Sequence, residues 1–166
     1  LSGMNLIIDD TDHPLIIKVA SIQAARMQVY FIDNEDYFQR KALLSDADGN
    51  FFDDNDERAI FFARGVLETV KKLRWSPDII HCQGWFTGIV PLLIKTLFAD
   101  DPTFMNSKVV FSLFDDKFTN KFDNTLKSKL TLSGFDTAPI DKHAALDYRS
   151  FSKIPIDYSD GIINAN

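Results

Sequence analysis

The chain has 166 residues, of which 45% are hydrophobic and 25% charged, so it is long enough for one domain with a substantial core. Its formal net charge of −6 disfavours nucleic acid and anionic membrane surfaces as partners. No apolar run reaches the roughly 20 residues that a membrane span requires. The single cysteine excludes a disulfide framework and favours a cytoplasmic location.

Two β-like runs open the chain, at residues 4–9 and 14–21, with a polar turn between them. This pattern predicts an antiparallel hairpin. A third run at 27–33 precedes an amphipathic segment at 54–75, which predicts a helix. Asp54 or Asn55 is the expected N-cap, with acidic residues in the first turn and basic residues in the last.

The rest of the chain alternates in the same way. The pattern predicts strands and helices at 78–82 (strand), 84–101 (a buried helix with Pro91 at a kink or in its first turn), 108–114 (strand), 119–150 (two or three short helices) and 161–166 (strand). Strands that alternate with helices from residue 27 onward predict an α/β fold, with a Rossmann-like parallel sheet and helices on both faces. Ligands bind at the carboxyl ends of such strands, here residues 81–84 and 114–117.

Several kinds of site are excluded by their spacing. Residues 46–57 imitate a calcium loop, but Phe51 stands where that loop requires glycine. His81 and Cys82 are neighbours on one strand, so their side chains point to opposite faces and cannot form a nucleophile–base pair. The histidines and the cysteine lack the spacing of metal ligands, and the glycine-rich nucleotide motifs are absent, so we expect no metal and no cofactor.

Three segments resemble the N-terminal catalytic domain of the glycogen and starch synthases. They are residues 29–68, the segment "WSPDIIHCQGWFTGIVPLLIK" (75–95) and the segment "SKVVFSLFDDKF" (107–118). The family pattern for the second is W-x-P-D-x-x-H-x-H-D-W-H-T-G-L-x-P. The resemblance implies the N-terminal half of a two-domain GT-B glycosyltransferase, and it makes residues 1–166 a single, truncated domain that lacks the C-terminal domain and the K-x-G-G-L loop.

This sequence departs from the family pattern at the centre of that motif. Gln83 stands where the family has its active-site histidine, Gly84 where it has an aspartate, and Phe86 where it has a second histidine. The Ile-His-Asn turn of the family reads Leu113–Asp115 here. Gln83 can donate and accept hydrogen bonds, but it cannot titrate as histidine does.

The resemblance implies roles for six residues. Catalytic roles are expected for Gln83, His81 and Asp54, and substrate-binding roles for Trp85, Thr87 and Arg58. Simpler alternatives stay open: Asp54 as a helix cap only, Arg58 in a surface ion pair, and Trp85 as a core residue.

The resemblance implies transfer of glucose from ADP- or UDP-glucose to an α-1,4-glucan, by the full protein and not by this chain alone. An alternative is a degenerate relative that binds a glucan or a partner without catalysis. A third interpretation, chance similarity, predicts that the strand order will not match a parallel, Rossmann-like half.

Overall fold

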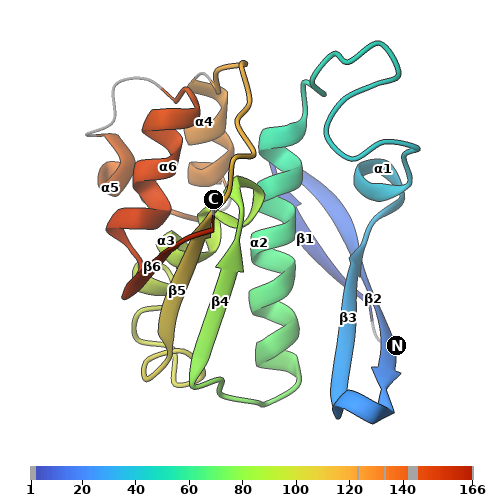
Figure 1. The fold of residues 1–166 in the computed structure, drawn as a ribbon, viewed down its shortest axis with the longest axis vertical. Coiled ribbons are helices and arrows are strands. Elements are labelled where there is room, and N and C mark those ends of the chain that lie inside the picture. The colour runs from blue at the N-terminus through green and yellow to red at the C-terminus, as the bar shows by residue number, and fades with distance from the viewer. Residues whose placement is uncertain (1–2, 123, 133, 142–145, 166) are drawn as a thin grey trace.

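The first part of the chain folds into an antiparallel sheet of order β1-β2-β3 in the computed structural model, which describes residues 3–122, 124–132, 134–141 and 146–165 (Figure 1). β1 (Met4–Ile8) and β2 (Thr11–Ile22) form the predicted hairpin. Its turn consists of Asp9 and Asp10, whose φ angles of 50° and 59° are both positive, as in the tight turns that match strand twist. The hairpin is confirmed, with a shorter turn and a longer second strand than expected.

β3 (Met27–Asp33) is a strand as predicted, but it pairs antiparallel with β2 and does not join the parallel sheet. The physical reason is the length of the connection. Only the short helix η1 (Gln23–Ala25) and Arg26 separate the two strands. A parallel neighbour requires a crossover of a dozen or more residues, which this connection cannot provide.

The long helix α2 (Asn55–Lys72) confirms the amphipathic prediction and packs against the antiparallel sheet. It follows the short helix α1 (Glu35–Phe38) and a loop over residues 39–54. The helix lies close to the sheet at Gly65, where an added Cβ would be 2.8 Å from Ile32 Cγ2 and 3.2 Å from Leu15 Cδ1. A side chain larger than hydrogen would therefore push α2 away from the sheet.

A second sheet consists of the parallel strands β4 (Ile79–Gln83), β5 (Lys108–Leu113) and β6 (Gly161–Asn164), in that spatial order. All three strands were predicted, although Asn166 of the last one lies outside the described residues. Adjacent parallel strands in chain order are what the Rossmann-like expectation requires, and they contradict the chance interpretation.

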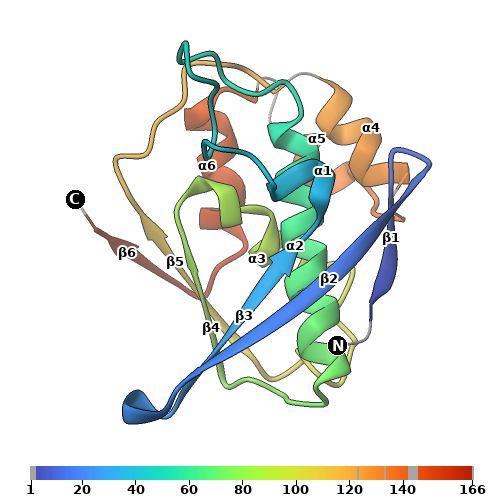
Figure 2. The ribbon, with the colours of Figure 1, turned by 90° about the vertical axis from the view of Figure 1, so that its right-hand side faces the viewer.

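Helices cover one face of this parallel sheet within the described part of the chain, where helices on both faces were expected. Figures 1 and 2 show α3 (Ile89–Lys95) and α6 (Tyr148–Asp157) behind the sheet. Cys82, Val109 and Phe111 are buried there. His81 and Gln83 alternate with Cys82 along β4 and are exposed on the other face.

The remaining helices are short, as the weak pattern at 119–150 indicated. They are α4 (Asn124–Leu132) and α5 (Ala138–Asp141). α6 begins within the predicted range but continues seven residues past its end, to Asp157. Pro91 lies in the first turn of α3, one of the two expected places. Among the described residues, no helix is both long and apolar enough to cross a membrane.

Candidate functional site

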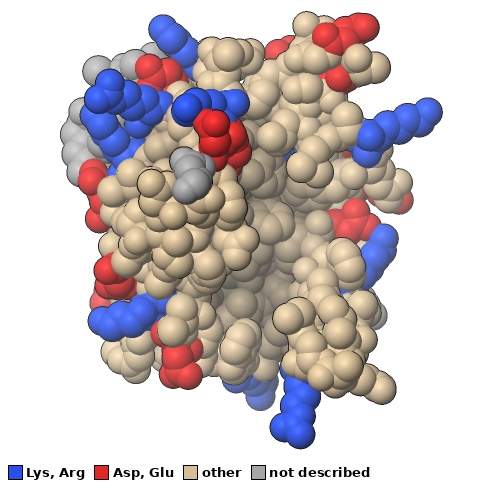
Figure 3. All heavy atoms as spheres, in the orientation of Figure 1, with Lys and Arg blue, Asp and Glu red and all other residues tan. Residues whose placement is uncertain are grey.

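A hollow of about 860 Å³ lies between the antiparallel sheet and the carboxyl end of β4. In Figure 3 it is the uncharged recess in the middle of the visible face. Its lining combines an apolar wall with a few polar and charged groups: Ile32, Phe38, Arg40, Lys41, Ala42, Leu43, Leu44, Arg58, Phe62, Gln83, Gly84, Trp85, Phe86, Thr87 and Asp116. An apolar concavity with few polar groups is the usual form of a small-molecule site.

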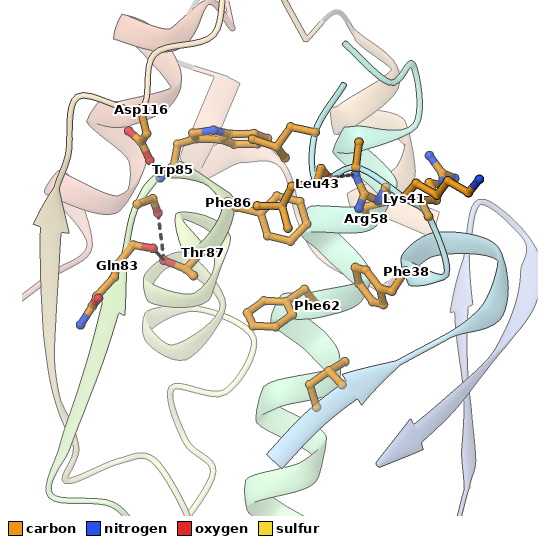
Figure 4. Close-up of a pocket in the computed structure, with 15 residues that line it drawn as sticks. Phe38, Lys41, Leu43, Arg58, Phe62, Gln83, Trp85, Phe86, Thr87 and Asp116 are labelled. Carbon is orange, nitrogen blue, oxygen red and sulfur yellow. Dashed lines mark hydrogen bonds between the residues drawn. The ribbon is translucent and has the colours of Figure 1, made fainter. Parts of the chain in front are cut away.

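Four of the six predicted site residues line this hollow: Arg58, Gln83, Trp85 and Thr87. Gln83 is the last residue of β4 and is exposed. In Figure 4 its side-chain amide is directed away from Phe62 and Phe86, toward the open face of the sheet. Its predicted catalytic role therefore requires that a substrate contact the end of β4 from that face.

His81 lies on the same face as Gln83 but does not line the hollow. Its Nε2 is 2.7 Å from Ser112 Oγ on β5. Cys82 points to the opposite, buried face, as the alternation predicted, and burial raises the pKa of its thiol to about 12. A protonated, buried thiol cannot act as a nucleophile at neutral pH, so the exclusion of a Cys–His pair stands.

β4 ends in a tight turn that begins at Gly84. Gly84 has φ 76° and ψ 164°, a backbone conformation that is almost restricted to glycine. The short helix η2 (Trp85–Thr87) follows at once. The Thr87 hydroxyl lies 2.9 Å from the Gly84 carbonyl oxygen and 3.2 Å from that of Gln83 (Figure 4). Thr87 therefore closes the turn, and its contact with substrate stays a prediction.

Trp85 is only 3% exposed and lies in a cluster of aromatic rings. The centroid of its ring is 4.9 Å from that of Phe118, 5.4 Å from Phe86 and 5.7 Å from Phe122. This environment corresponds to the alternative of a core residue. Substrate binding by Trp85 stays a prediction, and the half-buried neighbour that faces the hollow beside it is Phe86 (Figure 4).

Arg58 is 4% exposed, which contradicts the alternative of a surface ion pair. Its guanidinium donates hydrogen bonds to the carbonyl oxygens of Tyr37 and Leu43, both at 2.8 Å, and to Asn55 Oδ1 at 2.5 Å. Burial lowers its pKa, and the nearby Arg40 lowers it further. The contacts show that Arg58 fixes the loop between α1 and α2, which forms the wall of the hollow opposite β4.

Asp54 occupies the N-cap position of α2 but makes no capping hydrogen bond with its side chain. Both of its carboxylate oxygens accept hydrogen bonds from Arg40, one of them from Nη1 at 2.8 Å. Arg40 lines the hollow, whereas Asp54 does not. Asp54 therefore does not border the hollow itself, but it contacts Arg40, which does.

Asp116 and Phe62 also line the hollow, and the sequence did not single them out. Phe62 projects from α2 and its ring centroid lies 5.8 Å from that of Phe86. Asp116 follows β5, and its Oδ2 accepts a hydrogen bond from the backbone N–H of Trp85 at 2.9 Å. The sequence did indicate the region of Asp116, because residues 114–117 were expected at the edge where the carboxyl ends of neighbouring parallel strands meet.

Within the described residues, no group of three or more His, Cys, Asp or Glu side chains could hold a metal ion. In the acidic loop, Asp46 Oδ1 accepts hydrogen bonds from the backbone N–H groups of Asp48 and Asn50 and so closes a turn. His13 contacts the hydroxyl of Tyr37 at 3.0 Å in the other half of the molecule. His143 lies outside the described residues.

A parallel sheet with helices packed against it and a hollow at the carboxyl ends of its strands is the usual ligand-binding arrangement of an α/β domain. The family model of the starch synthase catalytic domain matches residues 4–165. The chain therefore belongs to the starch synthase catalytic domain family.

Individual relatives agree with this assignment. The chain is 40% identical over 114 residues to the glycogen synthase of Chlorobium limicola, a match that covers 68% of this chain and 23% of that protein. It is 37% identical over 140 residues to the glycogen synthase of Clostridium perfringens, covering 82% of this chain and 27% of that protein. The matched segments thus cover about a quarter of the length of these curated relatives.

A solved structure supports the fold. The catalytic domain of starch synthase IV from Arabidopsis thaliana, bound to ADP and acarbose, superposes with a TM-score of 0.75 at 19% identity. The match covers 97% of this chain and 32% of that chain. The expected fold class is confirmed.

Proposed function

We propose that the whole protein, of which this chain is a part, is a glucosyltransferase that moves glucose from ADP- or UDP-glucose to the end of an α-1,4-glucan. Membership of the starch synthase catalytic domain family supports the reaction class. The observation that carries the proposal is the hollow at the end of β4, which unites Gln83, Trp85 and Thr87 with an aromatic wall. Aromatic faces and a few hydrogen-bonding groups suit a sugar.

The proposed roles follow from the geometry. Gln83 would hydrogen-bond the glucosyl unit from the end of β4, with His81 beside it on the exposed face of the sheet. Asp54 would act through Arg40, which it holds at the edge of the hollow. In such a site, rate enhancement comes from positioning the reactants and from stabilising charge on the departing nucleotide.

The nucleotide donor and the glucan acceptor are proposed partners of the whole protein. Glycogen synthases of Chlorobium limicola and Clostridium perfringens and a starch synthase bound to ADP and acarbose are similar to this chain, and this similarity favours ADP-glucose as the first donor to test. We propose that the C-terminal domain supplies most of the nucleotide site, so this chain alone would not catalyse transfer. The matched part of this chain covers only 23% of the Chlorobium limicola glycogen synthase, which leaves room for such a domain.

The test is incorporation of labelled glucose. The full-length protein is incubated with ADP- or UDP-[¹⁴C]glucose and glycogen, and the radioactivity of the precipitated glycogen is measured. The 166-residue chain is assayed in parallel and should incorporate nothing. Absence of label with both donors for the full-length protein would refute the transferase proposal.

A second candidate is a glucan-binding protein that has lost transfer. It is favoured by Gln83 and Phe86, which replace two histidines of the family pattern, and by the turn of the Gln83 amide away from the hollow. Native electrophoresis in gels with and without glycogen distinguishes the two. Retardation without incorporation of glucose supports this candidate. If the protein shows neither retardation nor incorporation, both proposals are refuted.

We also propose a cytoplasmic location. The sole cysteine, Cys82, is a free thiol, as is usual in a reducing compartment. Fractionation of the source cells followed by immunoblotting checks this, and recovery outside the cytoplasmic fraction would refute it.

A further inference from the structure

The carboxylate of Asp116 bridges two elements that are far apart in the sequence. Its Oδ2 accepts a hydrogen bond from the backbone N–H of Trp85 at 2.9 Å. Its Oδ1 lies 2.9 Å from the hydroxyl of Tyr148, which is the first residue of α6. Asp116 therefore connects the turn after β4 with the start of α6, and it does so beside the hollow (Figure 4).

The same carboxylate occupies the space above Gly84. A Cβ at position 84 would lie 2.7 Å from Asp116 Oδ2, closer than a Cβ tolerates. The positive φ of 76° independently disfavours any other residue. Gly84 and Asp116 are therefore matched: the glycine leaves the room that the carboxylate fills.

Position 84 is the one at which the family pattern has an aspartate. In this chain the turn after β4 still has a carboxylate beside it, but the carboxylate comes from the loop after β5. We infer that Asp116 is a positioning residue that holds the Gly84–Thr87 turn in place. Through that turn it orients Gln83 on one side and Phe86 on the other.

The environment of Asp116 supports a specific role over a general surface charge. Asp116 is half-buried, and the ring of its partner Tyr148 packs edge-on against Phe118 at a centroid distance of 5.4 Å. Burial raises the pKa of Tyr148, and its hydrogen bond to Asp116 raises it further, so the phenol stays a proton donor. The neighbouring Asp115, by contrast, is 70% exposed and pairs with an equally exposed Lys117.

The experiment compares Asp116→Ala, Asp116→Asn and the control Asp115→Ala in the full-length protein. The asparagine keeps an acceptor for the Trp85 N–H, whereas the alanine does not. Because small misplacements cost rate more than affinity, we expect Asp116→Ala to lower kcat by about tenfold to a hundredfold with little change in KM. Asp116→Asn should restore most of kcat, and Asp115→Ala should match the unmodified protein.

Hydrogen exchange of the backbone amides provides a readout that does not depend on transfer. Asp116→Ala should speed exchange in the Gly84–Thr87 segment, and Asp116→Asn and Asp115→Ala should not. Unchanged exchange in Asp116→Ala would overturn the inference. Equal loss of kcat in both Asp116 variants with normal exchange would also overturn it, because charge and not position would then be responsible.

A second comparison tests the match between the two positions. Gly84→Asp is made in the unmodified protein and in the Asp116→Ala variant, and thermal unfolding is measured. The loss of Tm should be smaller in the Asp116→Ala background, because the overlap with the carboxylate is gone. Equal losses of Tm would overturn the match between Gly84 and Asp116.

The inference rests on the proposed function only where kcat is measured. A full-length protein without transferase activity would refute the proposed function, and hydrogen exchange and Tm would still decide the role of Asp116.

Discussion

The ammonium group of Lys129 lies 2.8 Å from the carboxylate of Asp56, although the two residues are 73 positions apart. Lys129 projects from α4, and Asp56 is in the first turn of α2. The side chains are only 12% and 4% exposed, and Glu57 also lies 2.8 Å from the same ammonium. Burial lowers the pKa of Lys129, but its hydrogen bonds to these two acids outweigh burial and raise it.

Replacing Lys129 by methionine should destabilise the chain by about 3 kcal/mol, because it leaves Asp56 buried without its cation. The control is Lys127→Met on the same helix, whose partner Asp141 is 54% exposed. That variant should lose less than about 1 kcal/mol. Urea denaturation followed by circular dichroism measures both, and equal losses would contradict the prediction.

Replacing Gly88 by alanine should destabilise the chain by about 1–3 kcal/mol through overpacking. The new Cβ would lie 2.9 Å from the Trp85 carbonyl oxygen, 3.0 Å from Phe151 Cε1 and 3.2 Å from Pro155 Cγ. Gly161→Ala is the control, since its nearest atom, Val110 Cγ2, is 3.8 Å away. Its stability should change by less than about 0.5 kcal/mol. A similar effect of the two substitutions on thermal unfolding would refute this account.

The sequence was sufficient to place the strands along the chain and to predict which end of the parallel sheet carries the hollow, because both depend on local pattern. Alternation of side chains along β4 predicted that His81 and Cys82 point to opposite faces. The change from a strand pattern to a helix pattern after Gln83 marked the end of the strand, where the hollow lies. Strand partners do not follow from local pattern in the same way. β3 looks like any buried strand, and only the short connection after β2 decides that it pairs there and not with β4.

The role of Asp116 could not be predicted, because it depends on a contact between two loops. In the sequence, Asp115 and Asp116 are equivalent acidic residues after β5. The structure separates them: one is exposed beside Lys117, and the other accepts the N–H of Trp85. α6 extends seven residues past the range predicted for the short helices. Pro155 falls in its last turn, where one lost hydrogen bond is tolerated.

The buried thiol of Cys82 should make stability depend on alkaline pH. Burial raises its pKa from the ordinary 9.0 to about 12, so the folded chain keeps the proton that the unfolded chain loses. The free energy of unfolding should therefore fall as pH rises from 9 toward 12, and be unaffected by this group below pH 9. Urea denaturation at pH 8 and pH 10 should show a larger decrease for the unmodified chain than for Cys82→Ala. An identical decrease would mean that the thiol titrates normally in the fold.

Replacing Gln83 by histidine in the full-length protein tests the role of this position in transfer. Glutamine does not titrate, so the unmodified protein should show no step in kcat from this residue between pH 5 and 8. Histidine has an ordinary pKa of about 6.5, so Gln83→His should introduce a step near that pH.

Gln83→Ala should lower kcat, because a hydrogen-bonding group is lost beside the glucosyl unit. The control is Ile79→Ala, on the same exposed face of β4 but four residues from its carboxyl end, where no effect on kcat is expected. If Gln83→Ala and Gln83→His both keep the kcat and the pH profile of the unmodified protein, Gln83 has no part in transfer.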